Sequence, residues 1–189
     1  MNKYKCLSQN EFVYGEYKLV PIRFEDRLDI MKWRNEQIYH LRQTKPLTVE
    51  DQNSYFENVI AELFVHDKPD QLLFSLLKND ICIGYGGLVH INWIDEHAEI
   101  SFIMETELEK NHFEEIWKNY LNMIEEIAFN FINLNKIYTY AFDLRPWLYK
   151  IFENSGFKIE AKLIDHIRYN GKHINVVIHS KLKQNGKNL

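Results

Sequence analysis

The chain has 189 residues, of which 46% are hydrophobic and 26% charged, and this length suits one well-filled core better than two domains. A net charge of −4 gives no overall electrostatic reason to bind nucleic acid or an anionic membrane. Two cysteines are too few for a disulfide framework, which indicates a reducing compartment, and without a long apolar run the protein is expected to be cytoplasmic.

The N-terminal part of the chain is predicted to contain a strand and two helices. Residues 1–16 show no clear hydrophobic period and are expected to form a loosely held lead-in before a strand at 17–22. Apolar residues then recur at helical spacing from 25 to about 39, after acidic residues suited to a first helical turn. Thr48 and Asp51 have the spacing of a capping box, which predicts that a second helix follows directly.

The middle of the chain is predicted to form an antiparallel meander of three strands and then a long helix. The strands are expected at residues 72–77, 81–93 and 98–104, because these runs are rich in branched and aromatic residues. The glycines of the second run mark a bulge or a place where something approaches the backbone closely. Apolar residues recur every three or four positions from 113 to 131, the period of one helical face.

The C-terminal part is predicted to add a strand, a short helix and a hairpin. Residues 136–142 are aromatic and branched, as strands commonly are. Pro146 suits the first turn of a short helix that Gly156 ends. An Asn-Gly pair, which tolerates positive φ, then predicts a hairpin of two strands over about 157–167 and 174–182.

The order of these elements resembles that of the GNAT-superfamily acyltransferases over nearly the whole chain. The strand containing Ala98-Glu99-Ile100 and the helix end Glu153-Asn154-Ser155-Gly156-Phe157 are similar to two further landmarks of that family. The resemblance implies an α+β fold of three layers, with a mixed central sheet of about seven strands flanked by about four helices. One domain is expected over residues 17–182, followed by a polar tail at 183–189.

The resemblance also implies an activity, the transfer of an acetyl group from acetyl-CoA to a primary amine. Trp33-Arg34-Asn35, then Arg42 and the aromatic pair Tyr55-Phe56, are similar to the N-terminal part of GNAT enzymes that acetylate amino groups on nucleotide-linked sugars. The expected acceptor is therefore a small-molecule amine, more narrowly an amino sugar on a nucleotide carrier. A homodimer is compatible with this resemblance.

Members of the family bind acetyl-CoA in a wedge between their fourth and fifth strands, so the resemblance assigns residues to the co-substrate. The strand holds the pantetheine arm, and the loop at the start of the long helix holds the pyrophosphate. At the start of the short helix a further residue could reach a phosphate or simply be solvated. The residues implied are Phe102, Ile103 and Met104 on the strand, Lys110, Asn111, His112 and Phe113 in the loop, and Arg145 at the short helix.

The start of the long helix departs from the family pattern, because residues 107–115 contain four glutamates and no glycine. Glycines let backbone amides approach an anion closely, whereas carboxylates repel it. Asn111 and Glu114 also have N-cap and N3 spacing, so their side chains could occupy the free helical N–H groups. Two alternatives follow: a GNAT-fold binding module, or an acyltransferase whose donor is an acyl carrier protein with a single phosphate on its phosphopantetheine.

Three residues are candidates for acid–base chemistry, which needs a base for the ammonium proton and an acid for the thiolate. Glu99, on the fourth family strand, could act as the base through a water, or could be paired with Arg or Lys. His90, on the preceding strand, belongs to a residue type that titrates near neutral pH, although a lone strand histidine is more often structural. Tyr149 lies one turn before Phe152, which occupies the family's tyrosine position, and could replace it as the acid or simply pack in the helix.

The candidate contacts to the acceptor lie near the first helix. They are Trp33, Arg34, Asn35, His40 and Arg42. Guanidinium groups match phosphate in bidentate fashion, so the two arginines could hold a diphosphate. On a continuous helix the two side chains would share a face. The alternative to diphosphate binding is that they form a solvated cationic edge. Tryptophans in so aromatic a chain are mostly core residues. The eight histidines show no close ligand spacing, so no metal site is predicted.

Overall fold

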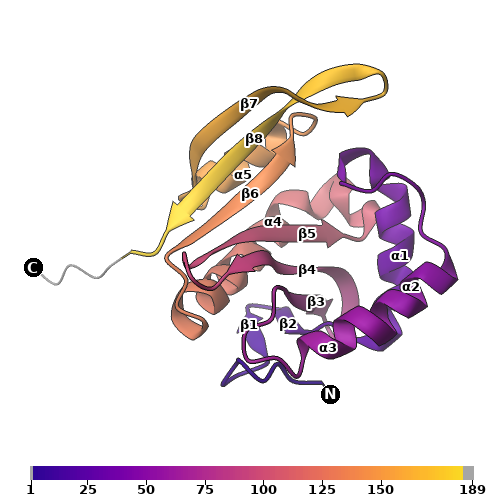
Figure 1. Ribbon diagram of the computed structural model, residues 1–189, viewed down its shortest axis with the longest axis vertical. Helices are drawn as coiled ribbons and strands as arrows, with labels where there is room; N and C mark the ends of the chain where they lie inside the picture. The colour runs from indigo at the N-terminus through magenta and orange to yellow at the C-terminus, as the bar shows by residue number, and fades with distance from the viewer. Residues whose placement is uncertain (1, 185–189) are drawn as a thin grey trace, which may run out of the picture.

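The computed structural model describes residues 2–184 and places them in and around an eight-stranded sheet (Figure 1). The strands lie in the order β1-β2-β3-β4-β5-β6-β8-β7. Neighbouring strands are antiparallel except β5 and β6, which run parallel. The strands are β1 (Phe12–Tyr14), β2 (Tyr17–Pro21), β3 (Leu72–Lys78), β4 (Ile81–Asn92), β5 (His97–Met104), β6 (Lys136–Phe142), β7 (Lys158–Tyr169) and β8 (Lys172–Leu182).

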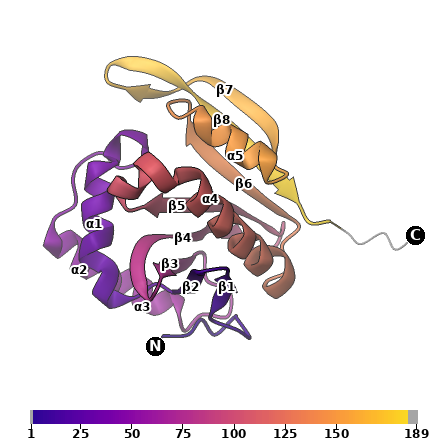
Figure 2. The same ribbon diagram turned by 180° about the vertical axis from the view of Figure 1, so that it is seen from behind.

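Helices cover both faces of this sheet, and Figure 2 shows α4 and α5 in front of it, with α2 and α3 toward the opposite face. A π-helical segment, Phe56–Ile60, joins α2 to α3, and another, Ile127–Phe131, extends α4. The predicted three-layer α+β architecture is therefore confirmed, with α2 and α3 forming one helical run. The helices are α1 (Arg27–Glu36), α2 (Val49–Tyr55), α3 (Ala61–Leu63), α4 (Glu109–Glu126) and α5 (Trp147–Asn154).

The N-terminal residues are part of the core, which corrects the expectation of a loosely held lead-in. Tyr4 is 1% exposed, and its hydroxyl donates a hydrogen bond to the Leu73 carbonyl (2.7 Å) and accepts one from the Leu73 N–H (2.8 Å). Phe12 is equally buried and packs edge-on against Phe131, with ring centroids 4.9 Å apart. Because these contacts join distant parts of the chain, no local hydrophobic period predicts them.

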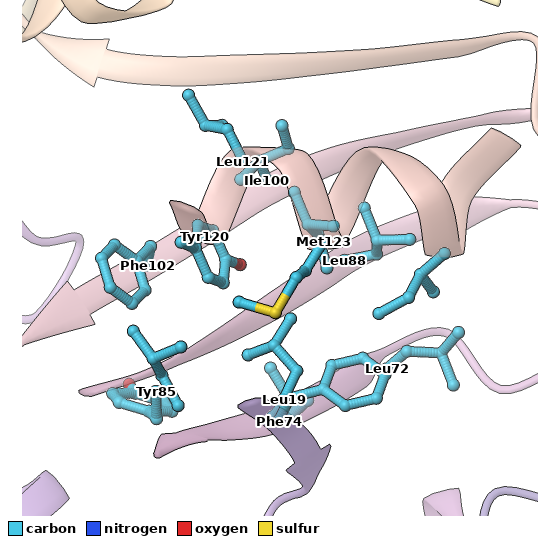
Figure 3. Packing of buried hydrophobic residues seen from close by; sticks show 14 of the residues in the cluster. Leu19, Leu72, Phe74, Tyr85, Leu88, Ile100, Phe102, Tyr120, Leu121 and Met123 are labelled. Carbon is cyan, nitrogen blue, oxygen red and sulfur yellow. The ribbon is translucent and has the colours of Figure 1, made fainter. Parts of the chain in front are cut away.

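A close approach to the backbone explains the glycines of β4, as predicted. A Cβ atom at Gly86 would lie 2.1 Å from the Ser101 carbonyl oxygen and 2.8 Å from the Tyr120 hydroxyl. That hydroxyl donates a hydrogen bond to the same Ser101 carbonyl (2.7 Å), and the Tyr120 ring stacks on Phe102 with centroids 4.0 Å apart (Figure 3). These contacts fix α4 against β5, the strand that carries the candidate site.

The starts of α2 and α4 differ in how well local spacing predicts them. Thr48 and Asp51 form the predicted capping box, with each side chain accepting a hydrogen bond from the backbone N–H of the other (both 3.1 Å). By contrast, α4 begins at Glu109 after a 3₁₀ turn, and its N-cap residue makes no side-chain cap bond. The predicted cap at Asn111 is wrong, because Asn111 already lies inside the helix.

Of the predicted polar tail, residues 185–189 lie outside the described residues. Within 2–184, no helix combines the length and hydrophobicity needed to span a membrane. In the same range, no three His, Cys, Asp or Glu side chains are grouped so that they could hold a metal ion.

Candidate active site

Strands β5 and β6 diverge and leave a wedge in the sheet (Figure 1). They pair only at His97, Ala98 and Glu99 of β5, so the β5 edge that faces β6 has no strand partner from Ile100 onward. A cavity of about 180 Å³ occupies the wedge. An extended chain that carries amide groups could pair with this free edge as another strand would. The apolar walls of the cavity include Phe102, Trp117, Leu148 and Phe152.

Glu99 lies at the apex of the wedge, where the pairing of β5 with β6 ends. Its side chain is 7% exposed and forms an ion pair with Arg42, and its Oε2 lies 3.9 Å from His90 Nε2. Burial raises the pKa of Glu99 above its ordinary value, and the charge and hydrogen bond of Arg42 limit that rise. A carboxylate whose pKa is raised is a stronger base than an ordinary one, which suits a general base.

His90 lies beside Glu99 but does not border the wedge cavity. It occupies the bulge of β4, with a φ of 52°, and its side chain is 64% exposed. This position gives the imidazole solvent on one side and Glu99 on the other. The distance to Glu99 exceeds that of a hydrogen bond, so the structure brings His90 near Glu99 without a direct contact between the two groups.

Tyr149 does not border the wedge cavity. Its hydroxyl donates a hydrogen bond to Asp143 (2.9 Å), and its ring packs against His179. Burial and the Asp143 carboxylate both raise the pKa of Tyr149, which makes it a weaker acid. Phe152, one turn later on α5, borders the wedge instead. The fold therefore does not bring the predicted acid together with Glu99.

Arg145 and Glu109 form an ion pair between the start of α5 and the start of α4. Arg145 Nη1 lies 3.3 Å from Glu109 Oε1, and their side chains are 11% and 20% exposed. Burial lowers the pKa of Arg145 and raises the pKa of Glu109, and each charge opposes the shift of the other. Arg145 borders the wedge cavity, as Arg34 and Arg42 do, and it could exchange its carboxylate partner for a phosphate there.

The residues predicted to hold a pyrophosphate lie in the first turns of α4, and they are Lys110, Asn111, His112 and Phe113. Lys110 pairs with Glu107 (2.7 Å) and His112 lies 3.5 Å from Glu115, all on exposed surface. At the start of α4 the N–H groups of Leu108 and Glu109 already donate to the Glu105 and Thr106 carbonyls of the preceding 3₁₀ turn, so these two groups are not free to bind an anion.

Of the three β5 residues predicted to hold the pantetheine arm, Phe102 borders the wedge cavity. Ile103 and Met104 are buried and are absent from its described lining. The Met104 carbonyl accepts a hydrogen bond from the side-chain amide of Gln37 (2.8 Å), which ties the end of β5 to the segment after α1.

A second, mainly apolar cavity of about 410 Å³ lies between the sheet and helices α1 and α2. Arg34 and Ser101 border both cavities, so the two chambers meet at these side chains. The Arg34 guanidinium donates hydrogen bonds to the Tyr85 hydroxyl and to Gln43 Oε1 (3.0 Å), which hold it at the junction. The second cavity is therefore adjacent to the wedge, with Arg34 and Ser101 as shared wall residues.

The predicted acceptor contacts separate into two groups. Trp33 is 4% exposed in the core, and Asn35 holds a loop through the Leu47 N–H (2.8 Å) and carbonyl (2.9 Å); neither borders the wedge cavity. Arg42 lies in the loop beyond α1, so the two arginines do not share the face of one continuous helix, although the fold brings both guanidinium groups to one cavity. The group that borders the wedge cavity is Arg34, His40 and Arg42.

Sequence reasoning missed Tyr85 and Ser101 as site residues. Tyr85 fixes the Arg34 guanidinium and borders the second cavity, and Ser101 joins the two cavities. A tyrosine between two glycines in a strand was one available signal. Strand alternation, which places Ser101 on the same face as Glu99, was the other.

His40 is held neutral at the wedge, which predicts a loss of stability in acid. Burial, and then the nearby charge of Arg145, lowers the pKa of His40 from its ordinary value of 6.5 to about 3. Between these values the unfolded chain takes up a proton that the folded protein does not, so the free energy of unfolding falls as the pH falls through this window. The slope is at most about 1.4 kcal/mol per pH unit, and His40→Gln should remove it.

Urea denaturation midpoints between about pH 7 and pH 5 test this dependence. The midpoint of the wild-type protein should fall more steeply with acidification than that of His40→Gln. His173→Gln, the same substitution at an exposed position on β8, is the matched control and should follow the wild type. Parallel curves for His40→Gln and the wild type would contradict the assignment.

Residues 19–178 match the family described as "Acetyltransferase (GNAT) domain". A spermidine N(1)-acetyltransferase of Vibrio cholerae serotype O1 is 26% identical over 112 residues, 59% of this chain and 63% of that protein, so the match spans less than two thirds of this curated relative. The crystal structure of spermidine N-acetyltransferase from Vibrio cholerae in complex with CoA and spermine has a TM-score of 0.76 at 21% identity, over 90% of this chain and 97% of that chain. A dodecameric structure of spermidine N-acetyltransferase from the same organism has a TM-score of 0.75 at 21% identity, over 93% and 98%.

Proposed function

This chain belongs to the acetyltransferase (GNAT) family, and from that premise we propose that it transfers the acetyl group of acetyl-CoA to a primary amine of a small molecule. GNAT acetyltransferases are acetyl-CoA-dependent enzymes, so the predicted enzyme class and co-substrate are confirmed at the level of the family. The alternative of a binding module loses one of its arguments, because no side chain caps the start of α4 as the spacing of Asn111 and Glu114 predicts.

The observation that carries the proposal is the free edge of β5 with a buried carboxylate at its apex. A pantetheine arm laid along this edge could form the hydrogen bonds of an added strand, with its thioester toward Glu99. Arg145 offers a guanidinium to a phosphate group, and guanidinium groups match phosphate oxygens in pairs. The residues of the wedge therefore fit an acyl-CoA.

In the proposed reaction Glu99 accepts the proton of the acceptor ammonium, directly or through one water. The amine nitrogen then bonds to the thioester carbon, and free N–H groups on the β5 edge stabilise the oxyanion. The carbon–sulfur bond breaks as the tetrahedral intermediate collapses. A second proton leaves the nitrogen and reaches the thiolate through solvent, since Tyr149 lies outside the wedge. The products are an amide and free CoA.

The acceptor predicted from the sequence, an amino sugar on a nucleotide carrier, lacks support among the relatives, which are spermidine N-acetyltransferases. Spermidine is therefore the reference acceptor for any assay. The homodimer expected from the sequence stays a prediction, and the structure of one relative is dodecameric.

Binding of acetyl-CoA tests the proposal most directly. Calorimetric titration is expected to show saturable binding with a dissociation constant of about micromolar order. Ala141 of β6 borders the wedge cavity, so Ala141→Trp should fill the wedge and weaken binding by roughly tenfold or more. Ala161→Trp, at a half-buried position of β7 outside the wedge, is the matched control and should bind as the wild type does.

The same titration can remove the proposal. A folded wild-type protein that shows no binding at about millimolar acetyl-CoA would not be an acetyl-CoA enzyme. Saturable binding of acetyl-phosphopantetheine under those conditions would then favour the alternative donor, an acyl carrier protein. Equal affinities of the two tryptophan variants would place the acetyl-CoA site outside the wedge.

A further inference from the structure

The second cavity lies where an acceptor must approach the wedge. Helices α1 and α2 and the loop between them enclose it on one side, and strands β3, β4 and β5 enclose it on the other. Ser101 borders both cavities and lies two positions from Glu99 on the same face of β5. A molecule held in this cavity could place an amino group beside Ser101, on the face of β5 that carries Glu99.

The walls of the second cavity are apolar over most of their surface. Its polar groups are largely engaged with one another: the Tyr55 hydroxyl donates a hydrogen bond to Gln71 (3.5 Å), and the Tyr85 hydroxyl accepts one from Arg34. A cavity of about 410 Å³ with such walls suits an apolar group of the size of an aromatic ring. The apolar wall residues are Ile22, Ile30, Leu47, Phe56, Leu73 and Val89.

The net charge of the side chains that border the second cavity is positive. The charged residues among them are two cations and one anion, namely Arg34, Lys45 and Asp51. Arg34 is fixed by its hydrogen bond to Tyr85. The Asp51 carboxylate accepts the Thr48 N–H in the capping box of α2, at an exposed position. The described lining holds no further carboxylate. A second ammonium group in this cavity would thus meet two cations and one carboxylate, that of Asp51, whose Oδ2 already accepts the Thr48 N–H.

We infer that the acceptor of this chain is a primary amine with a single positive charge and an apolar body of ring size, rather than a polyamine. This inference rests on the proposed acetyl transfer at the same site. The amino group loses its proton to Glu99, and the apolar body fills the cavity between α1, α2 and the sheet. In this respect the chain departs from the spermidine N-acetyltransferases that it resembles.

Two amines of opposite character test the inference. At saturating acetyl-CoA, kcat/KM for phenylethylamine should exceed that for spermidine by about tenfold or more. Calorimetric titration of each amine into CoA-saturated protein gives a second measurement that needs no turnover. Tighter binding and faster acetylation of spermidine, or no binding of phenylethylamine, would overturn the inference and leave the acetyl transfer intact. Absent binding of acetyl-CoA itself would overturn the proposed function, and the inference with it.

Cavity-filling variants locate the amine. Val89→Trp should weaken phenylethylamine binding by about tenfold or more and keep the affinity for acetyl-CoA, which also shows that the variant is folded. Val65→Trp, at a 61% exposed position outside both cavities, is the matched control and should affect neither ligand. Unchanged phenylethylamine binding in Val89→Trp would place the amine elsewhere and end the inference.

A charge reversal tests the electrostatic part of the inference. Lys45→Glu replaces one of the two cations with a carboxylate that could pair with a second ammonium group. The ratio of spermidine affinity to phenylethylamine affinity should rise by about fivefold or more. A ratio that stays at its wild-type value would contradict the role given to the cavity charge.

Discussion

Glu99→Gln is expected to lower kcat for amine acetylation by about 100-fold or more, because glutamine keeps the size of the side chain but does not accept the ammonium proton. The substitution leaves a polar partner for Arg42, so the fold and the KM for acetyl-CoA should change little. Release of free CoA thiol, followed at saturating concentrations of both substrates, measures kcat directly.

Glu125→Gln is the matched control for this experiment. Glu125 on α4 is also largely buried, is paired with Lys181, and has its pKa raised by burial, yet it borders neither cavity. The kcat of the Glu125→Gln variant should stay within about twofold of the wild-type value. A kcat for Glu99→Gln equal to that of Glu125→Gln would remove Glu99 from the proton transfer.

The pH dependence of kcat separates proton transfer by Glu99 from a purely structural role. Glu99 must be ionised to accept a proton, so kcat should fall as the pH drops through its pKa, which burial places above the ordinary value. Because Arg42 lowers this pKa, Arg42→Gln is expected to move the acid limb of the kcat profile to higher pH. Superimposable acid limbs would contradict the assignment.

Tyr4→Ala is expected to lower the free energy of unfolding by about 3–5 kcal/mol, as truncation of a buried aromatic side chain does. The Tyr4 ring packs against Phe64 and Phe74, with centroids 4.8 and 5.6 Å apart. Its removal also leaves the Leu73 carbonyl and N–H without their hydroxyl partner. Urea denaturation followed by tryptophan fluorescence measures the loss.

Tyr14→Ala is the matched control, because Tyr14 lies on β1 and is 50% exposed. Its truncation should cost less than about 1 kcal/mol. Tyr4→Phe keeps the ring and removes only the hydroxyl, so its loss should be intermediate, at about 1–3 kcal/mol. Similar losses for the two alanine variants would mean that the N-terminal residues are the loosely held lead-in that their sequence predicts.

The two capping patterns show where prediction from local spacing succeeds and where it fails. Thr48 and Asp51 have the spacing of a capping box and form one. Asn111 and Glu114 have the same spacing, but α4 has already begun at Glu109. Its start follows from the exit of β5, where the Glu105 N–H bonds to a carbonyl of β4 and a 3₁₀ turn comes next. Sheet pairing therefore overrode a local preference.

By itself the sequence determined the order and type of nearly all the elements, the family resemblance, and the place of Glu99 on its strand. Hydrophobic periodicity and helix caps involve residues only a few positions apart, so they can be recognised in the amino-acid sequence. Only the tertiary structure decided that Arg42 pairs with Glu99 across 57 positions and Arg34 with Tyr85 across 51. These pairs depend on the divergence of two strands and on the helices folded over them, and contacts at such separations leave no local pattern.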